Sequence, residues 1–97
     1  MSNQLIGATQ IREQVARICG SPQFRAAGRL RDFLNFVVTE TIEGRGCQIK
    51  EYTIGTLVYA RHPLFDPKLD SIVRVEAMKL RNRLAEYYKQ DGSADLL

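Results

Sequence analysis

The arrangement of apolar and polar positions predicts a chain made of helices. The clearest stretch is 70–88, where four apolar residues recur at the i, i+4, i+7 and i+11 spacing of one helix face: Val73, Ala77, Leu80 and Leu84. Asp70 and Ser71 stand where an N-cap belongs, because their side-chain oxygens can accept from the free N–H groups of the first turn. At about 1.5 Å per residue, the segment predicts a rod of roughly 28 Å. We therefore expect a long helix with one face in the core.

Two further stretches carry most of the remaining predicted core. Residues 29–43 have the widest apolar face and are expected at its centre, with these members: Leu30, Phe33, Leu34, Val37, Val38, Thr41 and Ile42. Residues 51–59 predict a shorter helix, whose apolar face consists of Ile54, Leu57, Val58 and Tyr59. Gly55 inside that helix should cost about 1 kcal/mol relative to alanine, so we expect a neighbouring helix to pack close there.

An additional helix is predicted near the N-terminus, over residues 9–19. Its apolar stripe is narrow and ends before Gly20, a natural helix stop: Ile11, Val15 and Ile18. The following residues predict a short turn through Phe24. Little β-structure is expected, with Ile49 as a single strand-like residue entering the core and the proline-containing segment 61–69 as a loop.

The length of the chain indicates one domain. Its 97 residues divide into a flexible N-terminus at 1–8, one domain at 9–90 and a short tail at 91–97.

The exposed face of the predicted helix 70–88 is unusual in composition. Viewed at 100° per residue, its residues point away from the apolar stripe and are flanked by arginines: Val75, Met78, Lys79 and Asn82, with Arg74, Arg81 and Arg83 beside them. Periodicity and charge leave two readings open at this point, a solvated surface and a face that contacts a polyanion.

Composition narrows the possible functions. Fourteen Lys and Arg against eleven Asp and Glu give a net charge of +3 and a pI near 9.1, which permits a polyanionic partner without demanding one. The two cysteines, Cys19 and Cys47, lack metal-ligand spacing, and His62 is the only histidine, so neither a metal nor another cofactor is expected. No nucleophile elbow or histidine-based acid–base pair is present, so we expect no enzyme.

The chain carries no signal for a membrane. The N-terminus lacks a basic region followed by an apolar run, and no stretch approaches about 18 consecutive apolar residues. We expect a soluble protein of the reducing cytoplasm with no membrane partner.

Two ungapped stretches resemble OmpR/PhoB-type winged-helix DNA-binding domains. Residues 49–59 resemble the positioning helix of that family, and residues 73–84 resemble its recognition helix, with alternating valines followed by a Leu-Arg pattern. A closer likeness is to the bacterial version found at the front of some cyclase-like, TolB-like and tetratricopeptide-repeat proteins. Its hallmarks span about residues 18–88: Leu30-Arg31-Asp32-Phe33-Leu34, Lys50-Glu51-Tyr52-Thr53-Ile54-Gly55, Phe65-Asp66-Pro67 and Val73-Arg74-Val75-Glu76-Ala77.

The resemblance implies roles for individual residues. Val75, Lys79 and Arg81 would face the major groove, the valine against a thymine methyl group and the cations toward guanine acceptors or phosphates. Arg74 and Arg83 would contact phosphate oxygens, which position a protein without reading sequence. Met78 replaces a basic residue usual in the family, and Asn82 completes the DNA-contacting face.

The resemblance also implies a departure from the complete fold. The family continues into a β-hairpin wing that pairs with a strand near Gln48–Lys50, whereas this chain ends at Leu97 with the wing missing or truncated. We therefore expect a mainly α, winged-helix-like trihelical helix-turn-helix core with an extra N-terminal helix. Apolar surface would be left open at Ile49 and at the end of the long helix, so a homodimer is predicted through these residues: Ile11, Val15, Ile18, Tyr87 and Tyr88.

Two functions remain as hypotheses. The first is the DNA-binding module of a bacterial transcriptional regulator, with helix 70–88 in the major groove of double-stranded DNA. RNA polymerase or another regulator would be a further partner, through the 60–69 loop. The second is a protein-interaction or homodimerisation domain that keeps the winged-helix framework without reading DNA. The salt dependence of binding distinguishes the two hypotheses, because binding to duplex DNA weakens steeply as the salt concentration rises.

Overall fold

The computed structural model of the protein describes residues 7–90 and 92. Over these residues it contains four α-helices, one short 3₁₀ turn and no β-strand. The helices are α1 Ala8–Cys19, α2 Gly28–Ile42, α3 Glu51–Leu57 and α4 Ile72–Lys89, and the 3₁₀ turn η1 is Gly46–Gln48. The expectation of a mainly helical fold is confirmed over this part of the chain. The predicted N-terminal segment and tail lie largely outside the described residues.

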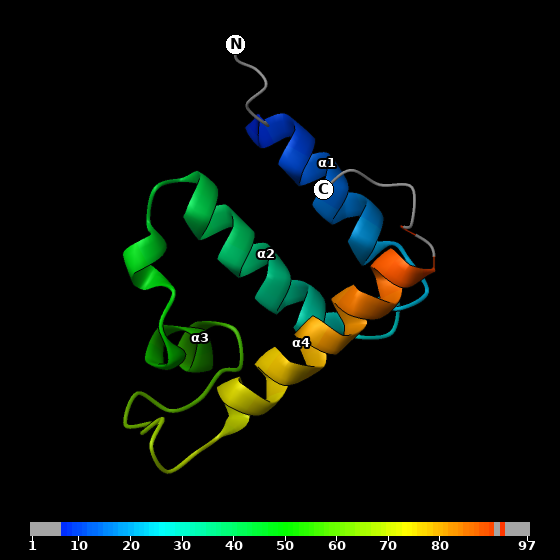
Figure 1. The fold of residues 1–97 in the computed structure, drawn as a ribbon. Coiled ribbons are helices and arrows are strands. Elements are labelled where there is room, and N and C mark those ends of the chain that lie inside the picture. The colour runs from blue at the N-terminus through cyan, green and yellow to red at the C-terminus, as the bar shows by residue number, and fades with distance from the viewer. Residues whose placement is uncertain (1–6, 91, 93–97) are drawn as a thin grey trace.

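The helices form an antiparallel pair crossed by the longest helix. Figure 1 shows α1 and α2 side by side, with α4 crossing the end at which α1 finishes and α2 begins. The short α3 lies near the first turns of α4. As a result, one face of α4 covers the core while the opposite face turns away from the other helices.

The core is built from the predicted stripes together with one residue of a connecting segment. Val73 and Leu80 of α4 are buried, and Ala77 and Leu84 pack partly buried against the core, as predicted for this helix. The most enclosed large side chain is Phe24, which is fully buried. Phe24 lies in the connection between α1 and α2, where the sequence predicts only a turn, so the core extends beyond the helix faces.

Two details of α3 differ from the prediction. Leu57 was expected on its apolar face, but the helix ends at this residue and the side chain is 69% exposed. Gly55 does meet a close neighbour, but the neighbour is a loop side chain and not a helix. A Cβ at Gly55 would overlap the ring of Phe65, which folds back from the α3–α4 connection.

The segment before α3 is a turn and not a strand. Gln48 N donates to Arg45 O at 2.8 Å, and Ile49 N donates to Gly46 O at 3.0 Å. Because these bonds close the segment on itself, the prediction that Ile49 is a strand-like residue is wrong. The Ile49 side chain still packs partly buried against the core, as expected.

The N-terminus of α4 is capped one residue earlier than its boundary suggests. Ser71 occupies the N-cap position but makes no side-chain capping bond. Asp70 Oδ1 accepts from Ile72 N at 3.0 Å, while Asp70 Oδ2 accepts from Arg61 Nε at 3.1 Å. The carboxylate of Asp70 therefore fixes both the start of α4 and the loop before it.

The N-terminal helix closes the end of the core. Val15, Ile18 and Tyr87 are buried, with Tyr87 only 3% exposed, and Gln14 Nε2 donates to the Tyr88 hydroxyl at 3.1 Å. The prediction of an open apolar patch is therefore wrong for Val15, Ile18 and Tyr87, because these three side chains are buried in the core of a single copy of the chain. Ile11 and Tyr88 are half-buried. The predicted homodimer stays a prediction, and of its five proposed interface residues only Ile11 and Tyr88 are partly exposed.

Candidate nucleic-acid interface

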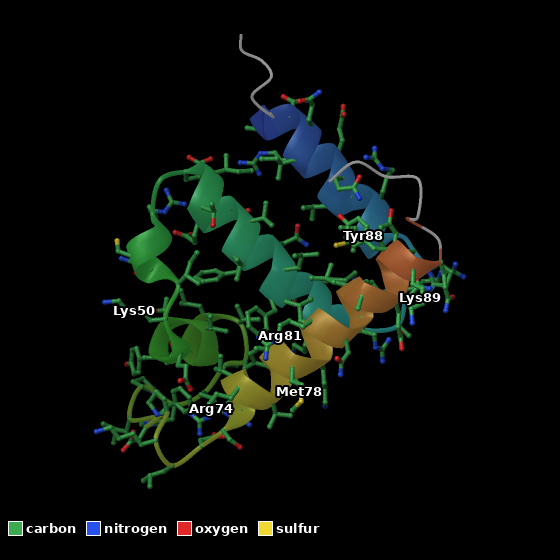
Figure 2. The ribbon with its side chains drawn as sticks, in the orientation of Figure 1. Lys50, Arg74, Met78, Arg81, Tyr88 and Lys89 are labelled. Carbon is green, nitrogen blue, oxygen red and sulfur yellow. The ribbon has the colours of Figure 1, made fainter. Side chains whose placement is uncertain are left out.

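The outward face of α4 is accessible along the helix. Val75, Met78 and Asn82 are exposed, and Met78 points away from the other helices in Figure 2. The helix has 18 residues and therefore a length of roughly 27 Å, which is enough to lie in a major groove. The predicted separation of a core face from an exposed face is thus present in the structure.

The flanking arginine nearest the start of α4 is tied to other elements. Arg74 Nη1 lies 2.8 Å from Glu51 Oε2 of α3 and donates to Pro67 O at 2.9 Å. The guanidinium thus holds α3, the α3–α4 connection and α4 together. Part of its charge is neutralised by Glu51, and its side chain remains about half exposed, so it could still contact a phosphate.

Arg83 has a similar structural role on the other flank. Its Nη1 donates to the main-chain oxygen of Gln23 at 2.6 Å, which links α4 to the α1–α2 connection. The carbonyl of Gln23 carries no full charge, so the guanidinium keeps its net charge at the edge of the α4 face. A contact with phosphate would have to share or replace this bond.

Lys79 is neutralised within α4 itself. Its Nζ lies 3.0 Å from Glu76 Oε2, three residues earlier. Glu76 also lies close to the buried hydroxyl of Tyr59, which makes no well-formed hydrogen bond to it or to any other described residue. Burial and then the nearby Glu76 carboxylate raise the pKa of Tyr59 well above its ordinary value. Lys79 is therefore less available to an anion than its position alone suggests.

Arg81 differs from the other cations of this face, because it has no partner in the part of the chain that the structure describes. Its side chain is exposed and has no hydrogen bond or ion pair to the described residues. Arg81 can therefore offer its full charge and its planar set of donors to a phosphate or a guanine edge. Figure 2 shows it on α4, one turn beyond Met78 and two turns beyond Arg74.

The sequence indicates only one of the partners of these cations. The Lys79–Glu76 pair follows an i, i+3 spacing that is visible in the sequence. The contacts of Arg74 with Glu51 and of Arg83 with Gln23 join residues far apart in the chain, so no local pattern reveals them.

The α3–α4 connection presents a second exposed surface. Leu64 and Leu69 are 85% and 87% exposed, although the connection itself is well fixed. Tyr52 stacks on Phe65 with ring centroids 6.4 Å apart, and its hydroxyl donates to Pro63 O at 2.9 Å. The two leucines are therefore held outward by an ordered loop.

Metal binding, cysteine chemistry and membrane insertion each depend on features of the described residues. They contain no cluster of three or more histidine, cysteine, aspartate or glutamate side chains that could bind a metal. Cys19 is partly buried, and Asn35 Nδ2 donates to its Sγ at 3.7 Å. Burial raises the pKa of the Cys19 thiol, which disfavours the reactive thiolate. None of the helices found between residues 7 and 90 combines the length and apolar character needed to cross a membrane.

Comparison with known proteins gives no relative. No family model, no curated protein and no solved structure matches the chain. The likeness to winged-helix domains therefore rests on the residues quoted for it, and the functional argument rests on the α4 face.

Proposed function

We propose that this protein is a winged-helix-like helix-turn-helix module that binds double-stranded DNA, as part of a bacterial transcriptional regulator. The observation that supports it best is the α4 face: a long helix, exposed along its outer side, on which the Arg81 guanidinium has no partner among the described residues. Val75, Met78 and Asn82 add apolar and hydrogen-bonding groups of the kinds that contact base edges. Helix α4 lies in the major groove, and α3 supports its first turns.

The contacts within the molecule divide the seven candidate residues into two groups. Arg81, Asn82, Val75 and Met78 are free to contact base edges directly. Arg74, Lys79 and Arg83 already have partners, and in this proposal they contact phosphates from their present positions or after exchange of those partners. Arg81 is therefore the strongest single contributor, in agreement with the role that the resemblance implies for it.

A salt-dependent gel-shift titration with duplex DNA tests the proposal. We expect wild-type affinity to fall steeply between low and physiological salt, because each neutralised phosphate releases counterions. Arg81→Ala should weaken binding by about 1–3 kcal/mol where the side chain contacts a guanine edge. Arg25→Ala is the matched control, since it removes an exposed arginine outside α4. Equal affinities for wild type and both variants would exclude the α4 face as the DNA contact.

The exposed loop supports protein interaction as the second candidate function. Leu64 and Leu69 offer apolar area of the kind that protein partners cover. In this alternative, the 60–69 loop docks on RNA polymerase, another regulator or a second copy of the chain, and α4 need not touch DNA. Such a complex would respond weakly to salt and would be lost in Leu64→Asp or Leu69→Asp, whereas Arg81→Ala would leave it intact.

A further inference from the structure

The α4 face carries its own counter-ion for one of its cations. Lys79 and Glu76 form an ion pair of 3.0 Å, but their two side chains differ in exposure. Lys79 is 60% exposed, whereas Glu76 is only 12% exposed, beside the buried Tyr59. The carboxylate is thus fixed at the edge of the core, and the ammonium on its long flexible stem is drawn back toward it.

This asymmetry places a cost on any contact between Lys79 and DNA. Glu76 has little freedom to follow Lys79 outward, because its side chain is only 12% exposed. An ammonium that leaves Glu76 for a phosphate exchanges one anion for another, so its net gain is smaller than that of an unpaired cation. The carboxylate left behind also repels the approaching phosphate.

We infer that Glu76 is a positioning residue that lowers the affinity of this protein for DNA by holding the Lys79 ammonium in competition with the phosphate backbone. The inference rests on the proposed function. Glu76 therefore has the opposite effect on DNA affinity from the cations of the α4 face. Removing its charge should strengthen DNA binding, whereas removing theirs should weaken it.

The test compares wild type with Glu76→Gln, which removes the charge and keeps the size of the side chain. With a mixed-sequence duplex at low salt, we expect Glu76→Gln to bind about three- to tenfold more tightly. The dependence of log affinity on log salt should steepen by about 0.9, because one more phosphate is neutralised. A merely structural role of Glu76 would change thermal stability without increasing the salt slope.

Two matched comparisons isolate the contribution of the Lys79–Glu76 ion pair to DNA affinity. Glu86→Gln removes the same charge from an exposed position farther along α4, and we expect it to tighten binding less than Glu76→Gln does. In a Lys79→Ala background, Glu76→Gln should have no more effect than Glu86→Gln. Equal effects of the two glutamine variants in the wild-type background would overturn the inference, as would weaker binding by Glu76→Gln.

A measurement without DNA separates this inference from the proposed function. NMR relaxation of the lysine ammonium groups should show Lys79 more ordered than Lys89 in wild type and equally mobile in Glu76→Gln. A mobile Lys79 in wild type would overturn the inference by itself. If Lys79 is ordered but no variant binds duplex DNA, the proposed function is overturned. The competition between Glu76 and DNA phosphates for Lys79 then falls as well. Duplex binding that Glu76→Gln does not tighten would overturn the inference alone.

Discussion

Gly55 shows how a single residue can couple a helix to a loop. The glycine lowers the intrinsic stability of α3, but it leaves the space in which the Phe65 ring lies. We expect Gly55→Ala to lower the free energy of unfolding by about 1–3 kcal/mol, because the overlap with Phe65 outweighs the gain in helix propensity. Urea denaturation measures this change.

The Phe65 ring provides the control for that experiment. In a Phe65→Ala background, Gly55→Ala should no longer be destabilising, and the better helix propensity of alanine should show instead. A Gly55→Ala protein as stable as wild type would contradict the close packing of α3 against its following loop.

Tyr59 gives the fold a sensitivity to alkaline pH. Its pKa is raised in the native state, so above pH 10 the unfolded chain loses the Tyr59 proton while the folded chain keeps it. The unfolded state then binds fewer protons, and the free energy of unfolding must fall as pH rises. Below pH 10 this contribution to stability is fully present.

We therefore expect Tyr59→Phe to unfold with a shallower loss of stability between pH 9 and pH 11 than wild type. Near neutral pH the two proteins should differ little, since the hydroxyl makes no hydrogen bond to the described residues. Urea denaturation at a series of pH values measures both. Parallel stability curves for the two proteins would show that the phenol of Tyr59 is accessible to water in the native state.

At the scale of elements, the helices could be predicted and their connections could not. The stripes of α1, α2 and α4 follow from local periodicity, so Val15, Leu34 and Leu80 are buried as expected. The burial of Phe24 and the exposure of Leu57 depend on where the chain turns, which periodicity does not determine. For the candidate site, the outward face of α4 was predictable, whereas its ties to Glu51 and Gln23 are made by tertiary contacts.

Because of these tertiary contacts, a mutation in α4 can change folding stability as well as DNA binding. Arg83 joins α4 to the α1–α2 connection, so Arg83→Ala should lower the free energy of unfolding by about 1 kcal/mol. Arg81→Ala, which breaks no such bond, should change stability by less than about 0.5 kcal/mol. Chemical denaturation compares them directly. Identical stabilities would mean that the Arg83 bond contributes nothing, and that any loss of DNA binding in Arg83→Ala is a direct effect.

At the scale of the whole molecule, α1 packs as part of the domain, and Val15 and Ile18 of its apolar stripe are buried without a second copy of the chain. Ile18 is buried among residues of the core, so Ile18→Asp should cost at least about 2 kcal/mol of folding stability. Ile11→Asp should cost less, because that side chain is half-buried. Denaturation and sedimentation equilibrium, measured together, check this. An Ile18→Asp protein that stays fully stable but changes from dimer to monomer would restore α1 as a dimer interface.

The bond between Gln14 and Tyr88 joins positions 74 residues apart, in the first and the last helix. Val15 and Ile18 of α1 and Tyr87 of α4 are also buried in the same hydrophobic cluster, so we expect α1 and the last turns of α4 to separate from the core together. The domain should consequently open in one all-or-none transition, without a partly unfolded form that keeps α2, α3 and most of α4. For the described helices, resistance to proteases is then set by the global unfolding equilibrium and not by local opening of α1 or of the end of α4.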